Sequence, residues 1–265
     1  MRLDYPLNNI YTYDTVGEFL QEAEARFGDR PAVSVYDGEG KEHCHTYRML
    51  VRDAKALALV LLDMGMAGKH LAIVGENSYE WLLMFLACSA IGAAAIPVDV
   101  EQQDEKIWQC IRFGDSCMAA VSREYEFLFQ NTRCCPVLYL WDNHDARSLP
   151  ALLSDGYRAL KDREKELDLV MDQVQKEQTA AIIYTSGTIS APKPVMLSHG
   201  NIMYNACHAQ ALVETGTKAY TCLPLYHAYS LVCGALNVLT QGQHLGLNGR
   251  VKNWMRDLRL FSPEM

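Results

Sequence analysis

Residues 180–201 read AAIIYTSGTISAPKPVMLSHGN, in which two apolar runs flank a polar loop with hydroxyls, a glycine and a lysine. The apolar run 180–184 is short and rich in isoleucine, which is typical of a buried parallel strand. Ser198 is a suitable N-cap for a helix that continues through Asn201 to position 213. The segment therefore predicts a strand, a loop and a helix, which the remaining segments must position.

The loop carries the donors that an anion-binding site needs. Thr185, Ser186, Gly187 and Thr188 offer three hydroxyls and several backbone N–H groups around one residue that tolerates any backbone angle. Lys193 adds a mobile positive charge. An ordinary surface loop has a similar composition, so the residues alone leave both interpretations open. The pattern G-x-x-x-x-G-K-[ST] does not occur, which disfavours a P-loop kinase or GTPase.

The bulk composition is that of a folded domain. The chain has 265 residues, of which 49% are hydrophobic, enough to bury a sizeable core in one large α/β domain or two small ones. Its net charge is −8, and no run rich in lysine and arginine provides a local exception. Nucleic acid is therefore not expected as a partner.

The cysteines indicate a reducing compartment. There are nine, without a C-x-x-C pair, and most stand in apolar segments. The adjacent Cys134 and Cys135 are interpreted as packing residues, and no cysteine–histidine group has metal-ligand spacing. The first ten residues have no apolar signal region. We therefore expect a cytoplasmic protein.

The rest of the chain alternates between helix and strand patterns. Helical spacing marks 16–27, 47–61, 81–91, 230–239 and 254–261. Strand patterns mark 32–36, 41–44, 71–74, 93–98, 220–223 and 242–247, and segments 107–113, 119–121, 125–129 and 137–140 continue the alternation. This order predicts an α/β protein with mostly parallel sheets and helices on both faces.

Two segments of the sequence allow more than one structural interpretation. Residues 81–98 are long and uncharged enough to span a membrane, but Gly92 and Pro97 divide them into a core helix and a strand, so no transmembrane segment is expected. Residues 155–178 are the most polar region of the chain. They are interpreted as a solvated helix or linker and as the expected position of a subdomain boundary.

Several motifs resemble those of one enzyme family. They are YTSGT at 184–188, PK at 192–193, LSHGN at 197–201 and LPLYH at 223–227. In this order they closely resemble the adenylate-forming superfamily, the AMP-binding enzymes, which includes acyl-CoA synthetases, luciferases and the adenylation domains of peptide synthetases. The residues at 223–227, together with Asn201, are most similar to those of long-chain fatty-acid-CoA ligases. The resemblance implies the layered αβαβα N-terminal region of such an enzyme.

The resemblance also implies a reaction and its site. Thr185, Ser186, Gly187, Thr188 and Lys193 would hold the ATP phosphates, with the Thr185 hydroxyl also near Mg²⁺. Lys193 and His227 would act in catalysis, His227 as a lining residue between the acyl carboxylate and the phosphate. The implied substrate is a carboxylic acid, expected to be a fatty acid, which is activated as an acyl-adenylate and passed to coenzyme A.

The departures from the family pattern support a second hypothesis. Ile189, Ser190 and Pro194 replace a threonine and two glycines of the usual loop. A non-catalytic nucleotide- or acyl-binding relative with a degenerate phosphate loop is therefore the alternative. The family's later motifs and its C-terminal domain find no match in residues 1–265. We expect a partial N-terminal AMP-binding domain that is inactive without the remainder of its chain, and the sequence leaves oligomerisation open.

Overall fold

The computed structural model describes residues 8–130, 135–185, 192–212, 216–249 and 253–264, and within them it contains two β-sheets. The four-stranded sheet has the order β2 (Glu42–Thr46), β1 (Pro31–Tyr36), β10 (His244–Leu247) and β9 (Lys218–Thr221). The six-stranded sheet has the order β6 (Val137–Tyr139), β5 (Ser116–Val121), β3 (His70–Val74), β4 (Ala94–Val98), β7 (Thr179–Thr185) and β8 (Lys193–Ser198).

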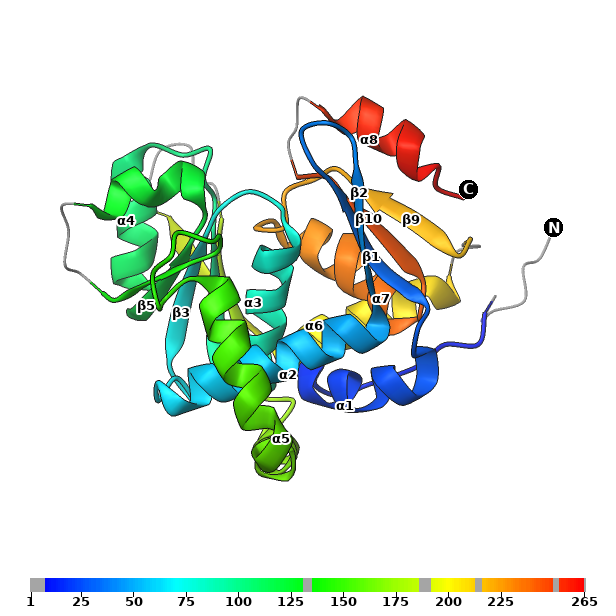
Figure 1. Cartoon of the computed structure of the whole chain (residues 1–265), viewed down its shortest axis with the longest axis horizontal. Helices are drawn as coiled ribbons and strands as arrows, with labels where there is room; N and C mark the ends of the chain where they lie inside the picture. Colours follow the sequence, from blue (N-terminus) through cyan, green and yellow to red (C-terminus); the bar gives the residue numbers. More distant parts are fainter. Residues whose placement is uncertain (1–7, 131–134, 186–191, 213–215, 250–252, 265) are drawn as a thin grey trace.

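Helices form the other layers of the molecule (Figure 1). They are α1 (Val16–Phe27), α2 (Tyr47–Asp63), α3 (Tyr79–Ala90), α4 (Asp104–Phe113), α5 (Leu149–Gln173), α6 (His199–His208), α7 (Asn237–Thr240) and α8 (Trp254–Phe261). Short 3₁₀ segments occupy Arg123–Phe129 and Ala209–Ala211, and a π-helix spans Ser230–Leu236.

The two faces of β3 show how the layers are held together. Leu71 and Ile73 point into a large core that also contains residues of α1, α2, α3, α6 and the four-stranded sheet. Ala72 and Val74 point into a second core with residues of α4. This alternation is that of a strand buried on both faces. With α8 against the outer face of the four-stranded sheet, the layers follow the expected αβαβα order.

Both sheets are mostly parallel, as predicted, and each has one antiparallel edge strand. β2 pairs antiparallel with β1, and β8 pairs antiparallel with β7. The prediction of a strand, a loop and a helix for residues 180–201 was wrong in one respect, because β8 stands between the loop and α6. An antiparallel partner needs only a short connection, and β7 and β8 pair as the two strands of a hairpin.

Helix boundaries follow the predicted capping residues in most cases. The Ser198 hydroxyl accepts from the Asn201 N–H at 3.1 Å, and the Asn201 side chain accepts from the Ser198 N–H, so that Ser198 caps α6 as expected. The predicted end of this helix was wrong, because α6 stops at His208 and position 213 lies outside the described residues. The helix predicted at 230–239 is instead a π-helix followed by α7.

The segment 81–98 divides as predicted into α3 and β4. None of the helices in the described part of the chain is long and apolar enough to cross a membrane. Residues 155–178 lie mostly in α5, which packs along α2 and buries Leu152, Gly156, Leu167 and Met171. The subdomain boundary expected there stays a prediction.

Candidate functional site

The β7–β8 hairpin brings two predicted site residues together. Thr185 is the last residue of β7 and Lys193 the first of β8, and they are partners in the antiparallel register. Both are exposed, and among the described residues none forms an ion pair with Lys193. The paired strand ends therefore present a hydroxyl and a positive charge to solvent. Ser186, Gly187 and Thr188, like Ile189 and Ser190, lie outside the described residues.

Pro194 occupies a position that tolerates proline. It follows Lys193 in β8, opposite Tyr184, and β8 is the edge strand of its sheet. Edge strands accept proline because one row of their backbone groups has no ladder partner. The replacement of the usual glycine is thus compatible with the strand that places Lys193.

The third predicted element of the site, His227, lies in the turn that follows β9. Its N–H donates to the Pro224 carbonyl at 3.1 Å, and its own carbonyl accepts from the Leu231 N–H at 3.0 Å. The side chain is exposed, whereas the neighbouring Tyr226 is buried, with 4.8 Å between the two ring centroids. In the part of the chain that the structure describes, His227 makes no hydrogen bond or ion pair with Thr185 or Lys193.

Asn77 connects the turn of His227 to the other sheet. Its side-chain amide follows β3 and donates to the Leu223 carbonyl at 2.9 Å, while its oxygen accepts from the Leu225 N–H at 2.7 Å. The Ser230 hydroxyl also donates to the Leu223 carbonyl, at 2.7 Å. Because Asn77 is buried, these bonds are protected from water and fix the two sheets relative to each other at this point.

A cavity of about 440 Å³ lies where the carboxyl ends of strands from both sheets meet. Its lining follows β3, β4 and β5 of one sheet and β9 and β10 of the other: Glu76, Asn77, Val100, Glu101, Glu124, Tyr125, Cys222, Pro224, Tyr226, Asn248 and Gly249. Ligands of α/β proteins bind preferentially at this edge. β7 runs parallel to β4, so Thr185 ends at the same edge, one strand further along.

The cavity is rich in carboxyl groups. Burial is the main cause that raises the pKa of Glu76, and the nearby Glu124 raises it further. The Ser122 hydroxyl donates to the Glu76 carboxylate at 2.8 Å. Burial also raises the pKa of Tyr226 well above its ordinary value, with smaller contributions from Asp99 and Glu101. An anionic ligand here therefore needs a compensating cation, such as a divalent metal ion.

The cavity-lining acids Glu76, Glu101 and Glu124 were not among the predicted site residues. Their positions in the sequence could have indicated them. Each stands two or three residues after a predicted parallel strand, and ligands of α/β proteins bind at the carboxyl ends of such strands. Oxygen donors of this kind are those that Mg²⁺ accepts, and the exposed hydroxyl of Thr185 is another. The donor atoms of these residues are thus chemically suited to a nucleotide bound together with Mg²⁺.

Comparison with known proteins assigns the chain to a family. A model described as "AMP-binding enzyme" matches residues 20–263. The acyl-CoA ligase sidI of Beauveria bassiana is 26% identical over 99% of this chain and 46% of its own length. The oxalate–CoA ligase of Arabidopsis thaliana is 27% identical over 86% of this chain and 44% of its own length.

Solved structures agree on the fold. A long-chain-fatty-acid-CoA ligase from Archaeoglobus fulgidus superimposes with a TM-score of 0.78 at 18% identity, over 99% of this chain and 52% of that one. The chain spans about half the length of the curated relatives it matches. Because the family model covers nearly all of the sequence, the chain belongs to the family of AMP-binding enzymes.

Proposed function

We propose that this chain is the N-terminal part of an ATP-dependent acid–thiol ligase whose substrate is a fatty acid. In the first step, a carboxylate oxygen bonds to the α-phosphorus of ATP while the bond to the β-phosphate oxygen breaks and pyrophosphate leaves. In the second, the sulfur of coenzyme A bonds to the acyl carbon and AMP leaves. The AMP-binding family match supports the reaction class, and coenzyme A ligases among the relatives support the thiol acceptor.

One observation carries the proposal at the level of residues. Thr185 and Lys193 are register partners at an exposed hairpin end, on the sheet edge that also borders the cavity. A lysine charge, a hydroxyl and the N–H groups of a loop are what phosphoryl transfer needs, because its catalysis is mainly positioning and neutralisation of phosphate charge.

We assign the following roles. Ser186, Gly187 and Thr188 cradle the β- and γ-phosphates, Lys193 neutralises the charge that develops on them, and the Thr185 hydroxyl is a ligand of Mg²⁺, which offsets phosphate charge when bound. His227 lies beside the cavity residue Tyr226 and borders the acyl carboxylate. A cytoplasmic location is part of this proposal, supported by the free thiols of Cys44, Cys88, Cys110 and Cys207.

The test is carboxylate-dependent exchange of labelled pyrophosphate into ATP by the complete gene product, over a panel of short, medium and long aliphatic acids. We expect exchange that depends on an aliphatic acid. Exchange with none of the acids would contradict the ligase proposal. Residues 1–265 alone should form no acyl-CoA, because they span about half of the relatives' length. Acyl-CoA formation by this chain would refute that part.

The alternative is a non-catalytic nucleotide- or acyl-binding relative, motivated by Ile189, Ser190 and Pro194. It predicts that the complete gene product binds ATP or an acyl chain but catalyses no exchange with any acid. Pro194 by itself does not favour this alternative, since its place in the edge strand β8 is compatible with proline.

A further inference from the structure

Three side chains of the kinds that bind metals converge on the outer face of the four-stranded sheet. Glu42 and Cys44 are two residues apart on β2, so they project from the same face of the strand. His244 begins β10. One possible ligand atom of each residue lies within 4.8 Å of the others. The three residues supply an oxygen, a sulfur and a nitrogen.

The strand register explains why residues some two hundred positions apart meet. β1 lies between β2 and β10. Its Ser34 is the partner of Cys44 on one side and of Gly246 on the other. Because side chains alternate along a strand, His244, two residues before Gly246, shares the face of Ser34 and Cys44. The arrangement is therefore fixed by the sheet.

Ser34 orients two of the three side chains. It is fully buried, and its hydroxyl donates to the Glu42 carboxylate at 2.7 Å. The same hydroxyl lies 2.8 Å from Nε2 of His244. A buried group that hydrogen-bonds to potential ligands holds them in place, as groups around metal ligands commonly do.

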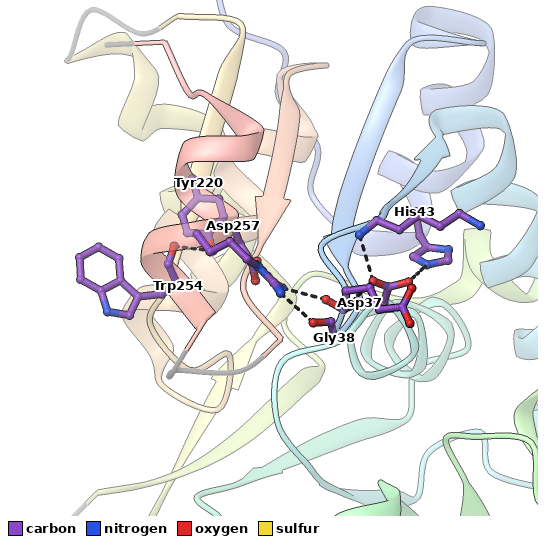
Figure 2. Close-up of polar contacts among 9 residues, drawn as sticks. Asp37, Gly38, His43, Tyr220, Trp254 and Asp257 are labelled. Atoms are coloured by element: carbon purple, nitrogen blue, oxygen red, sulfur yellow. Dashed lines mark hydrogen bonds and ion pairs between the residues drawn. The ribbon is translucent and has the colours of Figure 1, made fainter.

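Helix α8 closes one side of this cluster. The Phe261 ring contacts the His244 ring, with 4.8 Å between centroids. Arg256 donates to the carbonyls of Asp37 and Gly38, both at 2.8 Å, and Figure 2 shows these two turn residues facing the helix. The nearby Lys218 is engaged, because its Nζ donates to the Phe261 carbonyl at 2.6 Å. Glu42 and Cys44 remain exposed, so an ion can enter from solvent.

We propose that Glu42, Cys44 and His244 bind one divalent ion of the zinc class, with water as the fourth ligand. Zinc accepts this mixture of S, N and O donors, at about 2.0–2.3 Å. The donor atoms lie within 4.8 Å of one another, and the exposed side chains of Glu42 and Cys44 are free to rotate toward a shared ion. The ion links β2 to β10 across β1. His244 is at the amino end of β10, whereas the cavity borders its carboxyl end, so the proposed ion site and the cavity lie at opposite ends of this strand.

The test is titration of the chain with Co²⁺, which replaces zinc and gives a thiolate-to-metal charge-transfer absorption. Wild type should bind one Co²⁺ with this absorption, and added Zn²⁺ should abolish it. Cys44→Ser should lose the absorption, and His244→Gln should weaken binding at least tenfold. Zn²⁺ should also raise the thermal midpoint of wild type but not that of Cys44→Ser.

Two matched variants serve as controls. His43→Gln changes the residue between the proposed ligands, whose side chain instead pairs with Asp37 at 3.3 Å (Figure 2). Cys117→Ser removes an exposed cysteine of the other sheet. Both should bind Co²⁺ as wild type does. Absorption that persists in Cys44→Ser, is lost in either control, or is missing from wild type would overturn the proposal. Circular dichroism identifies any variant that fails to fold. If Cys44→Ser fails to fold, Cys44→Ala repeats the test of the cysteine ligand.

Discussion

His199, in the LSHGN motif, illustrates what a single residue contributes. Its side chain is fully buried at the start of α6, where Nδ1 accepts from the Val16 N–H at 3.4 Å. Nε2 has no hydrogen-bond partner among the described residues. Burial lowers the pKa of His199 from 6.5 to about 4, because the charged imidazolium would lose its hydration. The folded chain therefore holds this ring neutral.

The free energy of unfolding should consequently depend on pH through His199. Between pH 6.5 and 4 the unfolded chain binds a proton there and the folded chain does not, so stability falls as the pH is lowered through this window and levels off below it. The lowered pKa of His199 corresponds to a decrease of about 3 kcal/mol in the free energy of unfolding across this window. His199→Asn, which keeps an acceptor for Val16, should flatten this part of the profile in denaturation experiments at several pH values.

His144→Asn is the control, because His144 is exposed. It should retain the wild-type pH dependence. If His199→Asn lost as much stability between pH 6.5 and 4 as wild type, the assignment to His199 would be wrong.

Residue patterns predicted local features well and side-chain environments poorly. The Ser198 cap follows from hydroxyl chemistry next to an apolar run, and the structure confirms it. Thr15, with Glu18 three residues later, has the sequence pattern of a capping box. Only half of it forms, since the Glu18 N–H donates to the Thr15 hydroxyl but the Glu18 carboxylate accepts from the Asp14 N–H and not from that of Thr15. The burial of His199 depends on packing against α1, which no local pattern specifies.

At the scale of elements, the packing of α5 on α2 depends on a close approach at Gly156. A Cβ atom there would lie 2.2 Å from the Ala56 carbonyl oxygen and 2.6 Å from its carbon. Around this contact, buried Lys55 of α2 donates to Glu164 and Asp168 of α5 at 3.1 and 3.0 Å. Glycine is thus required for the distance between the two helices.

Gly156→Ala should therefore destabilise the fold although alanine is the better helix former. The gain in helix propensity is about 1 kcal/mol, whereas forcing atoms into a packed interface against backbone costs about 1–3 kcal/mol or more. Because the new methyl group would meet backbone atoms at 2.2 Å, the cost lies at or above the upper end of that range, so we expect a net loss of about 2 kcal/mol or more in urea denaturation. Gly38→Ala, with nothing within 4 Å of the new methyl group, should change stability by less than about 0.5 kcal/mol. Equal effects of the two variants would contradict this account.

Most elements could be predicted from apolar periodicity, and the exceptions have identifiable causes. β8 begins with Lys193 and Pro194, two residue types that are uncommon in strands, so the sequence does not predict a strand there. Its strand conformation depends on antiparallel pairing with β7. The π-helix after His227 packs so closely on β9 that a Cβ at Gly234 would lie 2.9 Å from the Thr221 hydroxyl. Contacts between segments that are distant in the sequence cannot be predicted from the local spacing of apolar residues.

At the scale of the whole molecule, the site depends on the meeting of two sheets. The cavity is lined from the carboxyl ends of five strands, and Asn77 holds the ends of β3 and β9 together through Leu223 and Leu225. The motifs of the sequence predicted the fold and the family, but not which acids line this cavity. The Glu42–Cys44–His244 cluster was missed for the same reason, since its members meet only through sheet register.

The central claim is that the end of the β7–β8 hairpin binds the phosphates of ATP. Its most direct test is the affinity of the complete gene product for ATP with Mg²⁺, measured by calorimetry for wild type, Lys193→Ala and Lys165→Ala. Lys165 is an exposed lysine of α5 and serves as the control. Loss of a charged hydrogen bond costs about 1.5–3 kcal/mol. We therefore predict binding at least tenfold weaker for Lys193→Ala and unchanged binding for Lys165→Ala; equal affinities of wild type and Lys193→Ala, or no binding by wild type, would contradict the claim.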